Sequence, residues 1–190
     1  MCPFSQSVGR RYHQVRELAA QLLGPRCLDV AQSYSDIGCA YNAMGQHDRA
    51  LEYHSKALVI QSENLGPRNK YLAATYNCIG IAMANREDIT QAFAHYIVAL
   101  DIRLDEFPNF SGSSDVACSL DNIGSMLKLE IAIERSLLYY AQSLDIQLQV
   151  LGPKHIQQAT TFVNIADAYQ KMIKLDQSLE CGPHATVGTF

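Results

Sequence analysis

The chain has 190 residues, of which 48% are hydrophobic and 18% are charged, so it can bury a sizeable core and is not disordered by composition. Its net charge of −4 argues against a broad nucleic-acid interface, because phosphate binding needs an excess of Lys and Arg. The N-terminus lacks the apolar run of a secretory signal, and no stretch reaches the roughly 18 apolar residues of a membrane span. These features predict a cytoplasmic protein with no nucleic-acid and no membrane partner.

The cysteines and histidines show no pattern typical of a catalytic or metal centre. Six cysteines are scattered without a C-x-x-C pair, and six histidines show no H-E-x-x-H motif. Cys39, Cys78 and Cys118 fall in predicted helices, where a small thiol packs well, and free thiols of this kind suggest a reducing compartment. No phosphate loop and no Gly-x-Ser-x-Gly motif is present. The sequence therefore predicts no enzyme activity, no cofactor and no metal.

The sequence repeats itself with a period of 42 to 44 residues. Leu-Gly-Pro begins at Leu23, Leu65 and Leu151. A helical block recurs with a small residue at one fixed place: Gly38, Gly80, Gly124 and Ala166. A second block follows 12 residues later and also begins with a small residue: Ala50, Ala92, Ser136 and Ser178. A period of this length is typical of small units that bury their apolar faces by stacking on one another.

Apolar residues in each block recur at intervals of three and four, which predicts a helix. In the first copy we expect Gly45 to end one helix and Asp48 to cap the next. Residues 128–132 contain no turn former, so a single unbroken helix is an alternative in the third copy; the preserved 12-residue spacing favours a break. In Leu-Gly-Pro we expect Gly66 to take a left-handed conformation and Pro67 to stop the helix.

A glycine inside a helix costs about 1 kcal/mol relative to Ala. Because Ala166 fills the same place in the fourth copy, the site requires a small residue, and we predict that two helices cross closely there. His54 aligns with Tyr96 and Tyr140, and we expect it to be a substitute for a core aromatic residue. His155, which follows the third Leu-Gly-Pro, is expected to have a structural role.

Together these columns resemble tetratricopeptide repeats, and the longer unit with Leu-Gly-Pro between copies is similar to the kinesin light chain type. HEAT and armadillo repeats have similar periods but do not predict the two columns of small residues 12 positions apart. The resemblance covers roughly residues 23–180 and implies an all-α, right-handed α-solenoid of antiparallel helix hairpins. The heptad region by which kinesin light chains bind the heavy chain has no counterpart in this sequence.

We divide the chain into a leader with a half-repeat helix (1–22), three repeats (23–64, 65–107 and 108–150, the last with a loop insertion), a truncated repeat (151–180) and a tail (181–190). The apolar stripe of Val15, Leu18, Ala19 and Leu22 predicts the half-repeat helix. In the truncated repeat we expect a first helix and about two turns of a second, stopped by Gly182-Pro183. The first helix would then lack cover over Phe162, Ile165, Ala166 and Tyr169, which predicts self-association through this end.

The resemblance implies a protein–protein interaction module that binds a peptide or helix of a partner in a concave groove lined by the first helix of each repeat. The groove residues it indicates are Ser35, Asn42, Asn77, Ile81, Asp121, Asn122, Lys128, Asn164 and Asp167. An alternative for each is an ordinary solvated helix-face residue. Binding of a terminal carboxylate is not expected, because Lys128 and Lys171 lie close to Asp121 and Asp167. A second hypothesis is a regulatory repeat fragment of a larger multidomain enzyme or motor complex.

Overall fold

The computed structural model describes residues 26–106, 113–129, 132–153 and 155–181, together with positions 14, 17, 18, 20, 21 and 24; only the backbone of 178–181 is described. All regular structure in this part of the chain is helical. The helices are α2 (Leu28–Ala43), α3 (His47–Asn64), α4 (Lys70–Asn85), α5 (Ile89–Glu106), α6 (Ser114–Leu129), α7 (Ile133–Leu151) and α8 (Ile156–Cys181). The predicted all-α fold class is confirmed.

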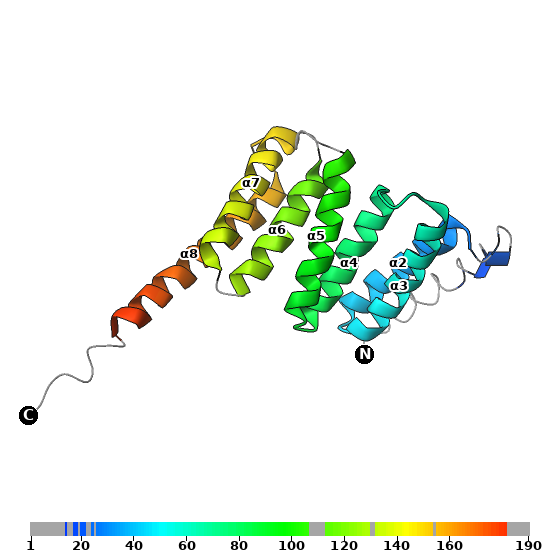
Figure 1. The fold of residues 1–190 in the computed structure, drawn as a ribbon, viewed down its shortest axis with the longest axis horizontal. Coiled ribbons are helices and arrows are strands. Elements are labelled where there is room, and N and C mark those ends of the chain that lie inside the picture. Colours follow the sequence, from blue (N-terminus) through cyan, green and yellow to red (C-terminus); the bar gives the residue numbers. More distant parts are fainter. Residues whose placement is uncertain are drawn as a thin grey trace, which may run out of the picture. The chain divides into compact units, whose positions relative to one another are not determined.

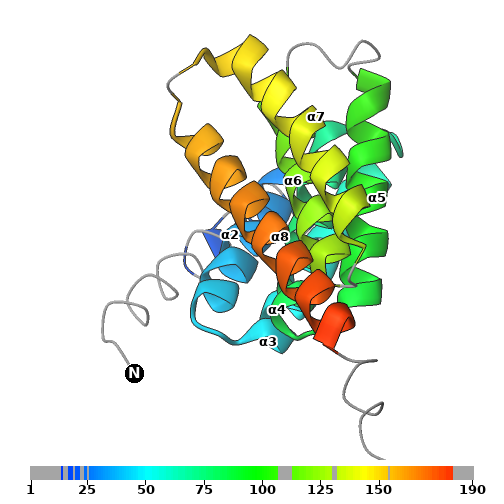
Figure 2. The same ribbon diagram turned by 90° about the vertical axis from the view of Figure 1, so that its left-hand side faces the viewer.

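The helices belong to two compact units, residues 1–109 and 110–190. In the first unit, α2 pairs with α3 and α4 pairs with α5, and α3 packs against α4 to join the two hairpins (Figure 1). In the second unit, α6 pairs with α7, and α8 lies along α7 (Figure 2). No helix in the described part of the chain is long and apolar enough to cross a lipid bilayer.

The two helices of each hairpin cross at the glycine predicted from the sequence. A Cβ added at Gly38 would lie 2.6 Å from the ring of His54, and the corresponding distance is 2.7 Å from Gly80 to Tyr96 and 2.8 Å from Gly124 to Tyr140. The small residues that open the second helices, Ala50, Ala92 and Ser136, are fully buried. These contacts confirm the close crossing, and they confirm His54, which is 1% exposed, as a substitute for a core aromatic residue.

The three hairpin turns share one backbone hydrogen bond that spans five residues. It runs from Gln46 N to Tyr41 O (2.9 Å), from Asp88 N to Met83 O (3.0 Å) and from Ala132 N to Leu127 O (3.0 Å). A left-handed residue precedes the donor in the first two turns, Gly45 with φ 72° and Glu87 with φ 67°, as in a Schellman motif. The third bond confirms the break predicted in the third repeat, where α6 ends at Leu129 and α7 begins at Ile133.

Two details of the predicted helix ends are wrong. Asp48 does not cap α3, because the helix begins one residue earlier and Gln46 takes the capping position; Asp48 instead places a negative charge in the first turn. Gly66 is not left-handed, although Gly24 (φ 94°) and Gly152 (φ 75°) are. The reason at Gly66 is that the preceding Leu65 is already extended, with φ −118° and ψ 153°, and ends α3 by itself.

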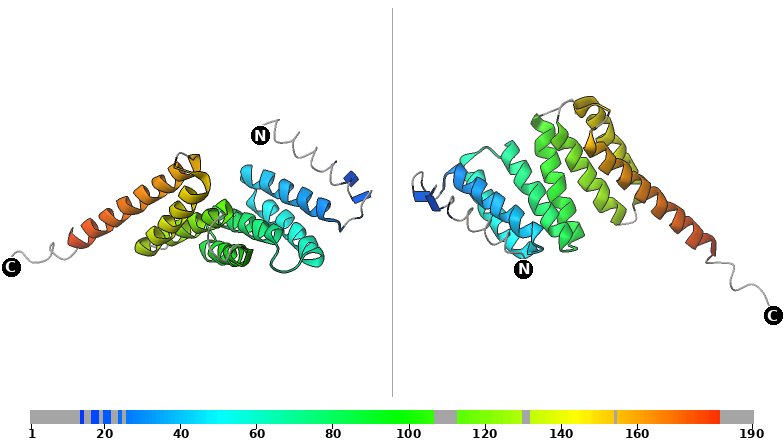
Figure 3. Two further views of the ribbon diagram at one scale, coloured as in Figure 1. Left: turned by 90° about the horizontal axis from the view of Figure 1, so that it is seen from above. Right: turned by 180° about the vertical axis from the view of Figure 1, so that it is seen from behind.

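Helix α8 differs from the predicted fourth repeat, because it runs as one helix of 26 residues with no break before Ser178. The position of the left-handed Gly45 is taken here by Ile173, and a β-branched side chain strongly disfavours positive φ. The expected second helix is therefore wrong, and the last turns of α8 continue beyond α7 (Figure 3). At its start, His155 Nδ1 accepts a hydrogen bond from Gln157 N (3.3 Å), which confirms the structural role of this histidine.

The predicted half-repeat helix is described only in part. Val15, Ala19 and Leu22 lie outside the described residues. Leu18 is helical but 59% exposed, whereas Ala20, which the predicted stripe omits, packs against the core cluster of Val30, Ala31 and Ile60. The described part of this helix therefore turns a different face to α2 and α3 from the one that the apolar stripe indicates.

Candidate functional site

The best-defined polar site is in the second unit and is built on a buried contact between three helices. Gln147 of α7 places its Nε2 2.9 Å from Thr161 Oγ1 of α8 and 3.0 Å from Asp121 Oδ2 of α6. Thr161 Oγ1 donates in turn to Asp121 Oδ2 at 2.9 Å. Gln147 and Thr161 are almost fully buried, so these bonds fix the separation of α6 and α8.

Asp121 is the charged member of this network, and burial raises the pKa of its carboxyl group. Hydrogen bonds from Thr161, Ser143 and Gln147 act in the opposite direction but only partly offset the burial. Its second oxygen, Oδ1, is buried and has no hydrogen-bond partner within the described part of the protein. The network therefore contains one carboxylate oxygen whose hydrogen-bonding capacity the described residues leave unused.

A cavity of about 200 Å³ lies above the network, between α6 and α8. Its walls carry hydroxyl, amide, carboxylate and thiol groups, from Ser114, Cys118, Asp121, Asn122, Ser125, Gln147, Gln157, Thr160 and Asn164. Three of the nine predicted groove residues, Asp121, Asn122 and Asn164, meet here. An Asn side chain both donates and accepts hydrogen bonds, so the two amides match the N–H and C=O groups of an extended peptide backbone.

The other two predicted residues of this unit, Lys128 and Asp167, form an ion pair between α6 and α8, with Nζ 2.6 Å from Oδ2. This pair lowers the pKa of Asp167, and Lys171 and Lys174 add smaller contributions. A second cavity of about 280 Å³ beside it is lined by Lys128, Leu129, Ile133, Lys171, Lys174 and Leu175. Because Asp167 already balances part of this positive charge, the lysines do not form an uncompensated clamp for a carboxylate.

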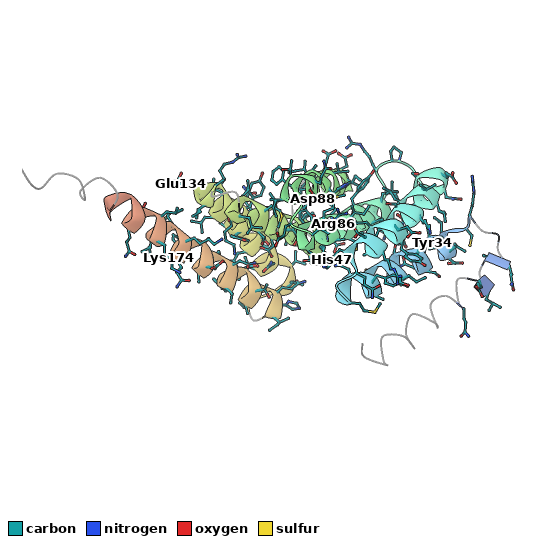
Figure 4. The ribbon with its side chains drawn as sticks, turned by 90° about the horizontal axis from the view of Figure 1, so that it is seen from below. Tyr34, His47, Arg86, Asp88, Glu134 and Lys174 are labelled. Carbon is teal, nitrogen blue, oxygen red and sulfur yellow. The ribbon has the colours of Figure 1, made fainter. Side chains whose placement is uncertain are left out.

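The four predicted residues of the first unit are not gathered in the same way. Asn42 Oδ1 lies 2.7 Å from His47 Nδ1 and accepts from Asn85 Nδ2 at 3.2 Å, which links α2, α3 and α4 at their turns. Figure 4 labels His47 in this region, together with Arg86, which follows the end of α4. Asn77 is 8% exposed, and Ser35 and Ile81 are half-buried. These positions contribute to contacts between helices more than to a surface open to a partner.

The sequence did not single out the two residues beneath the cavity: Gln147 lies on a second helix, and Thr161 lies on the buried side of a first helix rather than on its outward face. The missing signal was a pair of polar residues repeated at a distance of 86 positions: Gln61 with Thr75, and Gln147 with Thr161. In the first unit Thr75 Oγ1 donates to Gln61 Oε1 at 2.7 Å, so the same pair joins neighbouring repeats there too. A polar pair that recurs in phase with apolar columns predicts a buried hydrogen bond between repeats.

Helix hairpins that cross at a glycine and repeat every 42 to 44 residues define an all-α repeat protein whose surfaces are built from successive equivalent helices. A family model described as tetratricopeptide repeat matches residues 9–63 and 40–105, and a second model of the same description matches 116–157. The chain belongs to the tetratricopeptide repeat family.

Known relatives point to one type of repeat. "Protein KINESIN LIGHT CHAIN-RELATED 2" of Arabidopsis thaliana is 23% identical over an alignment of 157 residues, and the match covers 80% of this chain and 22% of that protein. The structure of BtubC (BKLC) from P. vanneervenii superimposes with a TM-score of 0.77 at 19% identity, covering 95% of this chain and 71% of that one.

A further structural neighbour consists of the nearly identical TPR-like repeats of a Podosopora anserina protein described as a kinesin light chain. It has a TM-score of 0.71 at 18% identity, with 93% of this chain and 82% of that chain covered. The chain spans about a fifth of its curated relative, and its repeats are similar to the kinesin light chain type, as the 42- to 44-residue period predicts. Its fold is that of a protein–protein interaction module and is typical of non-enzymatic scaffolds.

Proposed function

We propose that this protein is a non-enzymatic cytoplasmic adaptor that binds an extended peptide of a partner protein in the polar cavity between α6 and α8. The observation that carries the proposal is the meeting of the Asn122 and Asn164 amides over the Asp121 network. Neighbouring first helices supply these groups, which is where tetratricopeptide repeats present a groove. The buried Gln147 and Thr161 hold the two helices at a fixed separation, so the peptide meets a preformed surface.

The cavity favours a backbone contact over capture of a charged group. Its two amides can bond to a peptide C=O and N–H. The Lys128 ammonium, further along α6, is already paired with Asp167. We therefore expect ligands that are extended and polar, with little dependence on a terminal carboxylate.

The test is a selection of peptides from a random library on the immobilised protein, followed by calorimetric measurement of affinity. The variant Asn122→Ala/Asn164→Ala removes two hydrogen-bonding amides at about 1 kcal/mol each, so Kd should rise roughly 10- to 30-fold. Gln142→Ala is the matched control, because Gln142 is an exposed amide on α7 outside the cavity. Equal weakening by both variants, or by neither, would refute the proposal.

We also propose self-association through the outer face of α8. Exposed apolar side chains follow this face: Phe162 (54%), Val163 (67%), Tyr169 (49%) and Ile173 (54%). The predicted patch is corrected at Ile165, which turns inward and packs on the cluster of Ile133, Tyr140 and Ala168. Contiguous exposed apolar surface favours association, and the exposed stripe is the part of α8 available for it.

A further inference from the structure

Three groups that bind metal ions converge in the first unit, although nothing in their spacing along the sequence relates them. Cys39 comes from α2, His54 from α3 and Cys78 from α4. One ligand atom of each residue lies within 4.8 Å of the others, and the two Sγ atoms are 4.0 Å apart. Cys39 and Cys118 are exposed, so the expectation that these thiols pack well within the helical repeats is wrong for both. At Cys39 this exposure lets an ion reach the cluster from solvent.

The helix crossing shared by the hairpins explains why the His54 and Cys39 side chains meet. In the second unit the ring of Tyr140 crosses Gly124, and its hydroxyl lies 3.0 Å from the hydroxyl of Ser125, the next residue. The equivalent positions in the first hairpin are His54, Gly38 and Cys39. The repeat thus brings the tip of the ring to the residue after the glycine, and in the first hairpin both partners are metal-binding types.

The imidazole is also held in place and incompletely bonded. Its ring packs so closely on Gly38 that even a Cβ there would lie 2.6 Å away, which prevents the ring from moving toward α2. His54 is 1% exposed, and its Nδ1 has no hydrogen-bond partner among the residues that the structure describes. A buried ring nitrogen in this state needs a proton acceptor, a donor or a metal ion.

The separation of the sulfur atoms fits a shared ion better than a disulfide. Two thiolates on a tetrahedral Zn²⁺, each at 2.3 Å, lie about 3.8 Å apart. The observed 4.0 Å is close to this value and about twice the S–S length of a disulfide bond, roughly 2.05 Å. An ion therefore requires only a small adjustment of the side chains.

We propose that Cys39, His54 and Cys78 form a three-ligand Zn²⁺ site whose fourth position is open to water or to a ligand from a partner. Each thiol that binds the ion releases its proton to solvent. The ion would join the first helices of two neighbouring repeats, α2 and α4, which otherwise touch through few residues. This proposal is independent of peptide binding at the α6–α8 cavity.

The test uses Co²⁺ as a spectroscopic substitute for Zn²⁺ on the full chain, reduced with a phosphine, with Cys2, Cys27, Cys118 and Cys181 replaced by Ser. We expect one equivalent of Co²⁺ to give a sulfur-to-metal charge-transfer band and the intense visible bands of a tetrahedral site, with both displaced by Zn²⁺. Cys39→Ser and Cys78→Ser should each remove this spectrum. Absence of the bands in the parent protein would overturn the proposal.

His54→Tyr distinguishes a metal ligand from a residue that only fills the core. It installs the residue that the other two hairpins carry at this place, so the helix crossing should survive, as checked by circular dichroism and the unfolding midpoint. We expect loss of tetrahedral Co²⁺ binding and of the rise in Tm that Zn²⁺ gives to the parent. A folded His54→Tyr variant that binds Co²⁺ as the parent does would exclude histidine from the site and overturn the proposal.

Discussion

The first hairpins of the two units share the same helix packing but carry different functional groups where their helices cross. In α2–α3 and in α6–α7 an aromatic ring crosses a glycine, a small residue opens the second helix, and the turn closes with the same five-residue hydrogen bond. At the tip of the ring, one hairpin has the histidine and cysteine of a candidate ion site and the other has a Tyr–Ser pair beside a polar cavity. The repeat therefore fixes volumes and directions and leaves the functional groups free to differ.

The largest expected effect on stability comes from disrupting the glycine–ring crossing that the hairpins share. Gly80→Leu places a side chain where even a Cβ would lie 2.7 Å from the ring of Tyr96, and overpacking of this kind should lower the free energy of unfolding by about 3 kcal/mol. Gly66→Leu is the control, since a Cβ there meets nothing within 4 Å, and it should change stability by less than about 0.5 kcal/mol. Urea denaturation measures both, and similar losses would mean that the crossing is not the critical contact.

The next effect separates the two Gln–Thr pairs. Gln147 donates to both Thr161 and the Asp121 carboxylate, whereas the Gln61 side chain accepts a hydrogen bond from Thr75. We expect Gln147→Ala to cost about 2 kcal/mol or more and Gln61→Ala about 1 kcal/mol, because only the first change removes a donor from a buried carboxylate.

The same variants give a pH signature. Loss of Gln147 should raise the already elevated pKa of Asp121 further, which carboxyl NMR titration can follow. The stability difference between wild type and Gln147→Ala should shrink as the pH falls through the Asp121 pKa, because the neutral acid no longer needs the donor. A difference that stays constant with pH would show that the carboxylate is not the partner that matters.

A smaller effect concerns Phe162 of α8, which is more exposed than the aromatic residues at the same place in the first two repeats. Tyr34 and Tyr76 pack on rings of their partner helices, at 5.9 Å from Tyr53 and 5.8 Å from His95, whereas Phe162 is 54% exposed. If α8 mediates self-association, Phe162→Ser should weaken dimerisation by about tenfold, since burying such a side chain contributes about 1.5 kcal/mol or more. Sedimentation equilibrium checks this, and an unchanged monomer–dimer balance would contradict it.

The smallest effect is a titration that distinguishes the first two hairpins. Burial lowers the pKa of His95, while the equivalent residue of the first hairpin is Tyr53. As the pH falls, the unfolded chain therefore protonates His95 before the folded chain does. The contribution of neutral His95 to stability is present above its usual pKa of 6.5 and is lost as the pH falls through its pKa in the folded state. NMR should place the His95 midpoint below 6.5, and His95→Tyr should remove this part of the acid sensitivity.

The small residues at Gly38, Gly80 and Gly124 were sufficient to predict the hairpins, because a small residue at the same place in every repeat indicates that two helices cross closely there. The continuity of α8 could not be obtained in the same way: the 12-residue phase suggested a break, but a turn also needs a residue that accepts positive φ, and Ile173 does not. Side chains distant in sequence were the other limit. The convergence of Cys39, His54 and Cys78 follows from how neighbouring repeats pack, which no local motif encodes.

The most direct measurement for the proposed function is NMR of the Asn side-chain amides during titration with a selected peptide. We predict that the NH₂ signals of Asn122 and Asn164 shift with the same saturation as the calorimetric Kd, because both amides line the cavity. The signals of Asn64 and Asn85, which donate to groups within the first unit, should stay in place. Shifts confined to the first unit, with Asn122 and Asn164 unaffected, would contradict peptide binding between α6 and α8.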